Sequence, residues 1–122
     1  MSKVVLLVED NDFVRKMYQF KLAKSGIEVI EAQDGESALK AIKEQKPDLV
    51  LLDIMMPGMS GIDVLKQLKK DKIVPKIPVI VLTNVMNQQS IEECKKLGAL
   101  DYIVKTDLTP SQVLDKIQAC LK

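Results

Sequence analysis

The chain has 122 residues, of which 47% are hydrophobic and 29% charged, and its formal net charge is +1. This length and composition are typical of one globular domain. The near-neutral charge provides no basic field for nucleic acid or an anionic membrane, and no apolar run approaches the ~18 residues of a membrane span. The apolar run Val4–Val8 is too brief for a signal peptide, so we expect a cytoplasmic protein without direct nucleic-acid or membrane contact.

The absence of histidine narrows the chemistry further. It excludes Ser-His-Asp and Cys-His catalysis, most zinc sites and a phosphohistidine on this chain. The two cysteines, Cys94 and Cys120, form no Cys-x-x-Cys pair, and we expect both as reduced thiols. Acid–base or metal chemistry must therefore use carboxylates, lysine and hydroxyl groups.

Five short apolar segments predict strands buried on both faces of a parallel sheet, because they are rich in Val, Ile and Leu and too short for helices. In chain order they are Val4–Val8, the weaker Ile27–Ile30, Leu49–Leu52, Val79–Leu82 and Leu100–Val104.

Longer stretches with helical spacing separate the strands, and each has apolar positions that we expect to face the core. These positions are Phe13, Met17, Phe20 and Leu22, then Ala38, Leu39 and Ile42, then Ile62, Leu65 and Leu68, then Ile91, Cys94 and Leu97, and last Val113, Leu114, Ile117 and Leu121. Gly26, Pro47 and Gly98 are expected stops, and Thr109 with Pro110 is a predicted helix start. Five β-then-α units without a linker predict one doubly wound α/β domain over residues 1–122, with no effector domain among them.

Polar residues stand where four of the predicted strands end. Acidic residues Glu9, Asp10 and Asp12 follow the first strand, and Asp53 ends the third. In such sheets the ligand lies beyond the carboxyl ends of the strands. Carboxylates crowded there repel one another unless a hard cation joins them, and oxygen ligands favour Mg²⁺, Mn²⁺ or Ca²⁺, with Mg²⁺ fitting a site of two or three carboxylates best.

The fourth and fifth strands add Thr83 with Asn84 and Lys105 with Thr106 at the same edge. Taken singly, these residues have plainer interpretations: the acids as a solvated turn, Asp12 as a helix cap, Thr83 as a strand-end hydroxyl and Lys105 as a surface charge. Asp53 is harder to explain away, because a carboxylate that ends a buried strand needs a partner. A flavodoxin-like flavin or nucleotide enzyme is disfavoured, since no glycine-rich phosphate loop follows the first strand.

The chain resembles the receiver domains of two-component response regulators over essentially its full length. The resemblance is carried by Val8–Asp10, by the Asp-x-x-Met-Pro-x-x-x-Gly stretch Asp53–Gly61, by Val81–Thr83 and by Gly98–Lys105. It implies a flavodoxin-like sheet of five parallel strands in the order 2-1-3-4-5 with five helices. It also implies a phosphorylation-dependent signalling switch rather than an enzyme, although one that assists its own phosphorylation and dephosphorylation.

The resemblance implies a role for each matching residue. Asp53 would accept the phosphoryl group. Asp10 and Asp53 would bind Mg²⁺ with the carbonyl of Met55, and Glu9 would bind directly or through water. Lys105 would pair with Asp53 and then with the phosphoryl oxygens. The remaining two residues would act in the switch, Thr83 by bonding the phosphoryl group and Tyr102 by changing rotamer.

The same resemblance implies partners. The phosphoryl group would come from a phosphohistidine on a histidine kinase or histidine phosphotransfer protein, and small phosphodonors would also serve. Output would pass through the face made by the fourth helix, fifth strand and fifth helix to a downstream effector or a homodimer partner.

Some positions depart from the family pattern. Thr106 follows Lys105 where most receivers have proline in a cis bond; a non-prolyl cis bond costs about 3–4 kcal/mol, so we predict a trans bond and a rearranged loop through Asp107. Asn84 stands where a small residue is common. Met55 and Val85 are apolar where polar side chains often orient the hydrolytic water, which predicts a slowly hydrolysed phosphoryl group. These departures keep open a pseudo-receiver, an interaction module without phosphoryl transfer.

Overall fold

A computed structural model describes residues 3–74 and 76–121 of the chain. Residues 1, 2, 75 and 122 lie outside the described residues. Strands and helices alternate along the chain. The elements are β1 (Val4–Val8), α1 (Asp12–Lys24), β2 (Glu28–Ala32), α2 (Gly35–Gln45), β3 (Leu49–Leu52), α3 (Gly61–Lys70), β4 (Val79–Thr83), α4 (Gln88–Lys96), β5 (Asp101–Val104) and α5 (Pro110–Cys120).

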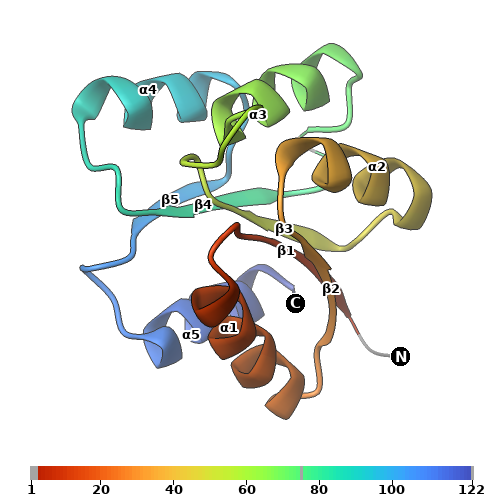
Figure 1. Ribbon diagram of the computed structural model, residues 1–122, viewed down its shortest axis with the longest axis vertical. Helices are drawn as coiled ribbons and strands as arrows, with labels where there is room; N and C mark the ends of the chain where they lie inside the picture. The colour runs from red at the N-terminus through yellow and green to blue at the C-terminus, as the bar shows by residue number, and fades with distance from the viewer. Residues whose placement is uncertain (1–2, 75, 122) are drawn as a thin grey trace.

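The strands form one parallel sheet in the order β2-β1-β3-β4-β5 (Figure 1), which confirms the predicted doubly wound α/β fold and strand order. The order reverses between β1 and β3, because the chain moves outward from β1 to β2 and then crosses back to β3. The loops that follow these two strands therefore open side by side, at the position where doubly wound sheets bind their ligands.

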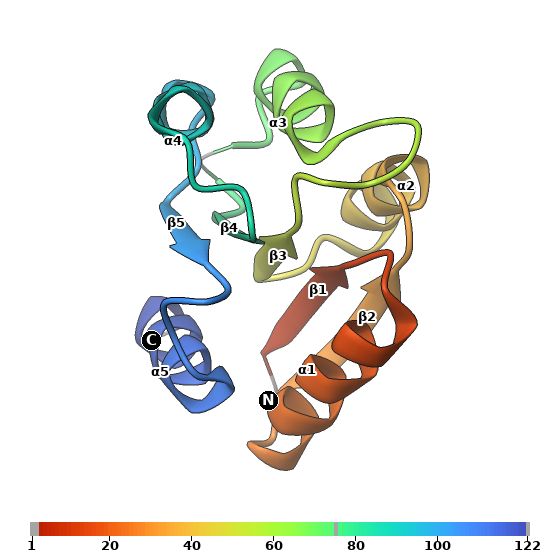
Figure 2. The same cartoon turned by 60° about the vertical axis from the view of Figure 1, so that its left-hand side comes forward.

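Helices cover both faces of the sheet (Figure 2). Helices α1 and α5 lie on one face, and α2, α3 and α4 lie on the other. Alternate residues of each central strand enter the two cores, as Leu51 and Leu52 of β3 do. Both faces are apolar, which explains why the central strands appear in the sequence as continuous apolar runs.

The predicted bounds of β1 and β3 are confirmed, while the other strands differ slightly. Strand β2 begins at Glu28 and extends to Ala32, and β4 includes Thr83. Strand β5 begins at Asp101, because the exposed Leu100 still belongs to the approach to the sheet. These shifts leave Thr83 and Lys105 at the carboxyl end.

Of the predicted core positions of α1, Leu22 is confirmed and the other three are wrong. Phe13 and Phe20 are 80% and 66% exposed, and Met17 is exposed as well, whereas α1 buries Arg15, Tyr18 and Leu22. Two apolar stripes with helical spacing run along this helix, and the sheet takes the one that contains Tyr18 and Leu22.

The helix ends follow the local sequence. Thr109 caps α5 in a capping box with Gln112, and Pro110 is the first helical residue, as predicted. The N-cap of α1 is Asn11, so the interpretation of Asp12 as the cap is wrong. None of the helices in the described part of the chain combines the length and hydropathy that a membrane crossing requires.

Candidate functional site

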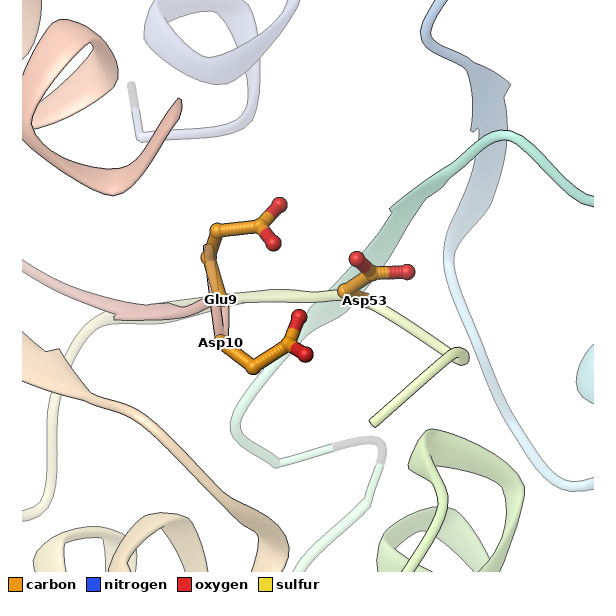
Figure 3. A group of neighbouring side chains, drawn as sticks. All are labelled: Glu9, Asp10 and Asp53. Atoms are coloured by element: carbon orange, nitrogen blue, oxygen red, sulfur yellow. The ribbon is translucent and has the colours of Figure 1, made fainter. Parts of the chain in front are cut away.

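Three carboxylates meet at the carboxyl end of the sheet (Figure 3). Glu9 and Asp10 follow β1, and Asp53 follows the neighbouring strand β3. One oxygen from each residue lies within 4.8 Å of the others. The parallel pairing of β1 with β3 produces this cluster, since it ends both strands at the same edge.

Asp53 is buried, with 5% of its surface exposed, and both of its carboxylate oxygens accept hydrogen bonds. The Met55 N–H donates to Oδ1 over 3.1 Å, and the Lys105 ammonium donates to Oδ2 over 3.1 Å. The Asp53 N–H donates to the carbonyl of Val8 on β1. Backbone and side chain are therefore both fixed, as a buried carboxylate requires.

Lys105 bridges two of the carboxylates. Its Nζ lies 2.5 Å from Glu9 Oε1 as well as 3.1 Å from Asp53 Oδ2. Burial alone would lower the pKa of the ammonium, but the hydrogen bond to Glu9 and the charge of Asp53 outweigh it, and the pKa of Lys105 is raised. Lys105 therefore stays charged and partly neutralises the acidic cluster.

Glu9 is buried, and each of its carboxylate oxygens accepts a hydrogen bond. Its Oε1 accepts from Lys105, and its Oε2 accepts from the Asn11 N–H over 3.1 Å. Burial raises the pKa of Glu9, and these two bonds only partly offset the rise. Asp10, by contrast, is exposed. Asp10 is therefore the carboxylate of the cluster that is most open to an incoming cation.

The start of α3 packs tightly against the backbone of Asp53. A Cβ on Gly61 would lie 2.3 Å from the Asp53 carbonyl oxygen and 2.7 Å from the Cα of Ile54. The Gly61 N–H also donates to the carbonyl of Ile54 over 2.9 Å. The glycine that ends the Asp-x-x-Met-Pro-x-x-x-Gly motif therefore permits a close approach that holds the segment after Asp53 in place.

Thr83 and Tyr102 are connected through one residue of the β4–α4 loop. Thr83 is fully buried and its Oγ1 accepts from the Val85 N–H over 3.4 Å, while the Tyr102 hydroxyl donates to the Val85 carbonyl over 2.6 Å. Burial raises the pKa of Tyr102 to about 12, so the phenol remains a donor. A change at Thr83 can reach Tyr102 through this loop.

The structure thus brings Glu9, Asp10, Asp53 and Lys105 into one cluster, with Thr83 ending the adjacent strand β4. The Met55 side chain points to solvent, and only its backbone N–H bonds Asp53.

Other positions that depart from the family pattern also lie near this edge of the sheet. Asn84 and Thr106 are exposed, and a turn closed by the Asp107 N–H and the Val104 carbonyl follows β5. The trans Lys105–Thr106 bond stays a prediction.

Sequence reasoning missed Arg15, a buried residue of α1 whose guanidinium bonds the carbonyl of Glu9 over 2.9 Å. A weak signal was present, because Asp12 precedes Arg15 by three residues and the two form an ion pair. The contact with Glu31 depends on the register in which β2 pairs with β1, which the strand order alone does not give.

The donor set fits a hard divalent cation. The cluster offers only oxygen ligands, one member is exposed to an incoming ion, and the three carboxylates carry more negative charge than Lys105 cancels. Such oxygen-only sites suit Mg²⁺, which needs few protein carboxylates.

Comparisons with known proteins identify the family of the chain. A family model described as the response regulator receiver domain matches residues 5–118, so the chain belongs to the response regulator receiver family. It is 41% identical to the chemotaxis protein CheY of Thermotoga maritima, with both proteins covered completely. Among solved structures it is similar to the Vibrio cholerae chemotaxis protein CheY4, with a TM-score of 0.90, 29% identity, and 99% of this chain and 100% of that chain covered.

Other relatives are larger transcriptional regulators. The chain is 38% identical to the alkaline phosphatase synthesis transcriptional regulatory protein PhoP of Bacillus subtilis, a match that covers all of this chain and 50% of that protein. The chain therefore spans about half the length of such relatives. Receiver domains are the signalling switches of two-component systems, and family membership assigns this chain to that class.

Proposed function

We propose that the chain is a phosphorylation-dependent switch that accepts a phosphoryl group on Asp53. The observation that carries the proposal is the setting of Asp53: a buried carboxylate, bonded by Lys105 and by the Met55 N–H, with two further acids within 4.8 Å. A buried acid that served only structure would not need two more carboxylates beside it.

The reaction would be a direct displacement at phosphorus. An oxygen of Asp53 attacks the phosphoryl group of a phosphohistidine on a histidine kinase or histidine phosphotransfer protein. The new O–P bond forms as the P–N bond breaks, and the imidazole leaves with the bonding pair. No side chain has to act as a base, because the Asp53 carboxylate is the nucleophile; Lys105 offsets the charge that gathers on the phosphoryl oxygens.

The acidic cluster would hold Mg²⁺ for this step. Asp10, Asp53 and the carbonyl of Met55 are the proposed ligands, and Glu9 would act directly or through water. Bound Mg²⁺ would supply positive charge that lets the anionic nucleophile and phosphoryl group approach each other.

The signal would leave the site through Thr83 and Tyr102. Phosphoryl oxygens would accept a hydrogen bond from the Thr83 O–H. A movement of Thr83 toward them would break the bond that its Oγ1 accepts from the Val85 N–H, and the loop bonded by Tyr102 would shift with it. This would change the face formed by α4, β5 and α5, which would then bind a downstream effector or a second copy of the chain.

The test is phosphorylation by a small phosphodonor in the presence of Mg²⁺, followed by intact mass measurement. The wild-type chain is expected to gain one phosphoryl group, and the variant Asp53→Ala is expected to gain none. If the wild-type chain gains nothing under conditions in which Mg²⁺ raises its melting temperature, the chain is a pseudo-receiver that keeps the fold without the chemistry. Phosphorylation that persists in Asp53→Ala would place the acceptor elsewhere.

A further inference from the structure

Arg15 is a buried charged residue that the proposed chemistry does not use. The buried polar or charged residues in the described part of the chain are Glu9, Arg15, Asp53 and Thr83. The other three belong to the candidate site, whereas Arg15 projects from the first turn of α1 toward the same edge of the sheet. Its position therefore calls for a role of its own.

The guanidinium of Arg15 connects three elements. Nη1 donates to the carbonyl of Glu9 over 2.9 Å, Nη2 donates to Asp12 over 2.6 Å, and Nε donates to Glu31 on β2 over 3.2 Å. The Glu9 N–H meanwhile donates to the carbonyl of Ala32 over 3.1 Å. Glu9 is thus held by β2 through its N–H and by Arg15 through its carbonyl.

The Glu9 carbonyl belongs to the planar peptide unit that joins Glu9 to Asp10. The orientation of this carbonyl therefore fixes the position of the Asp10 backbone. Asp10 is exposed, and no hydrogen bond to its carboxylate is found among the described residues. Its placement near Asp53 therefore depends on the backbone. We propose that Arg15 is a positioning residue for the cation site, which orients the Glu9–Asp10 peptide so that the Asp10 carboxylate faces Asp53.

The ion pairs of Arg15 explain its burial less well than its bond to the Glu9 carbonyl does. The side chains of Asp12 and Glu31 are 74% and 39% exposed, and exposed ion pairs contribute little. The bond to the Glu9 carbonyl is the buried one. Electrostatics also separates the two explanations, because a positive charge near the site repels a cation. A purely electrostatic Arg15 would weaken Mg²⁺ binding, whereas a positioning Arg15 strengthens it.

This inference rests on the proposed cation site and is tested by Mg²⁺ affinity, independently of phosphorylation. The affinity is measured for wild type, Arg15→Met and Arg15→Lys by calorimetric titration and by the Mg²⁺-dependent rise in melting temperature. Arg15→Met removes the charge and the donors, whereas Arg15→Lys keeps the charge but loses the planar fork. Both variants are expected to bind Mg²⁺ about tenfold more weakly, as is typical when a group that orients a ligand is lost.

Glu31→Gln is the matched control, because it removes a charge from the Arg15 cluster while the bond to Glu9 remains; its Mg²⁺ affinity is expected to stay within about twofold of wild type. Tighter Mg²⁺ binding by Arg15→Met, or unchanged binding by Arg15→Lys, overturns the inference. If Arg15→Met does not fold, the affinity of Arg15→Lys decides alone. A wild-type chain that binds no Mg²⁺ overturns the cation site itself.

Discussion

At the carboxyl end of the sheet Glu9 and Asp53 are buried and bonded within the protein, whereas at the amino end the charged residues face solvent. An open groove at the amino end, between the last turns of α2 and α3, is lined by Ile42, Ile73, Ile77, Asp71, Lys43, Lys46, Lys72 and Lys76. Its only ion pair among the described residues joins Lys43 to Asp71 over 3.3 Å, and both side chains are partly exposed. The same kinds of charge therefore have different consequences at the two ends: removing one at the carboxyl end leaves a buried partner uncompensated, and removing one at the amino end changes little.

The largest expected difference concerns the two lysines. Lys105→Met is expected to slow phosphorylation of Asp53 by a small phosphodonor about 10²–10³-fold, because it removes the charge that opposes the developing phosphoryl charge. Lys43→Met removes an exposed ion pair at the amino end and should leave the rate unchanged. The measurement is the rate of phosphoryl incorporation by intact mass at saturating Mg²⁺. Equal rates for both variants would show that the bridge between Glu9 and Asp53 has no part in the reaction.

The meeting of charges at the carboxyl end could be predicted from the sequence for a simple reason. Apolar runs fix where strands end, and parallel pairing brings the residues that follow them to one edge; Asp53 and Lys105 meet in this way although 52 residues separate them. This prediction required only that the positions at which the strands end be known. It did not require the conformation of any loop.

The prediction for α1 was confirmed at Leu22 and failed at the other positions, where side-chain direction mattered. Phe13 and Phe20 share helical spacing with each other, and so do Tyr18 and Leu22, so that hydrophobic periodicity alone cannot choose between the two stripes. The choice also involves Arg15, whose acceptors include the backbone carbonyl of Glu9. A backbone acceptor leaves no mark in the amino-acid sequence, and the buried arginine was missed for that reason.

Backbone packing at the carboxyl end gives the second prediction, which concerns stability. Gly61→Ala places a Cβ against the Asp53 carbonyl and is expected to lower the free energy of unfolding by about 3 kcal/mol, since the fixed backbone cannot yield. Gly26→Ala, in the α1–β2 turn at the amino end, meets open space and has only its positive φ of +84° to accommodate, so it should lose about 1 kcal/mol. Urea unfolding of both variants measures the difference. Similar losses would mean that α3 can move away from Asp53 at little cost.

The buried thiol of Cys94 on α4 allows the two ends of the sheet to be compared through the pH dependence of stability. Cys94 is fully buried near the end of α4 that leads back to the amino end of the sheet, and burial raises the pKa of its thiol from 9.0 to about 11. The folded protein therefore holds this proton more tightly than the unfolded chain does. The resulting stability is complete below pH 9 and is lost as the pH rises to about 11.

Between pH 8 and pH 11 the wild-type free energy of unfolding should consequently fall by about 2 kcal/mol more than that of Cys94→Ala, which has no thiol to titrate there. Urea unfolding at several pH values measures the two slopes. Parallel slopes would show that the ionised thiol reaches solvent or a partner in the folded state. A steeper loss of the free energy of unfolding in the wild type would establish that burial at the amino end of the sheet keeps a titratable group neutral. At the carboxyl end, by contrast, the buried titratable groups are charged and paired with one another.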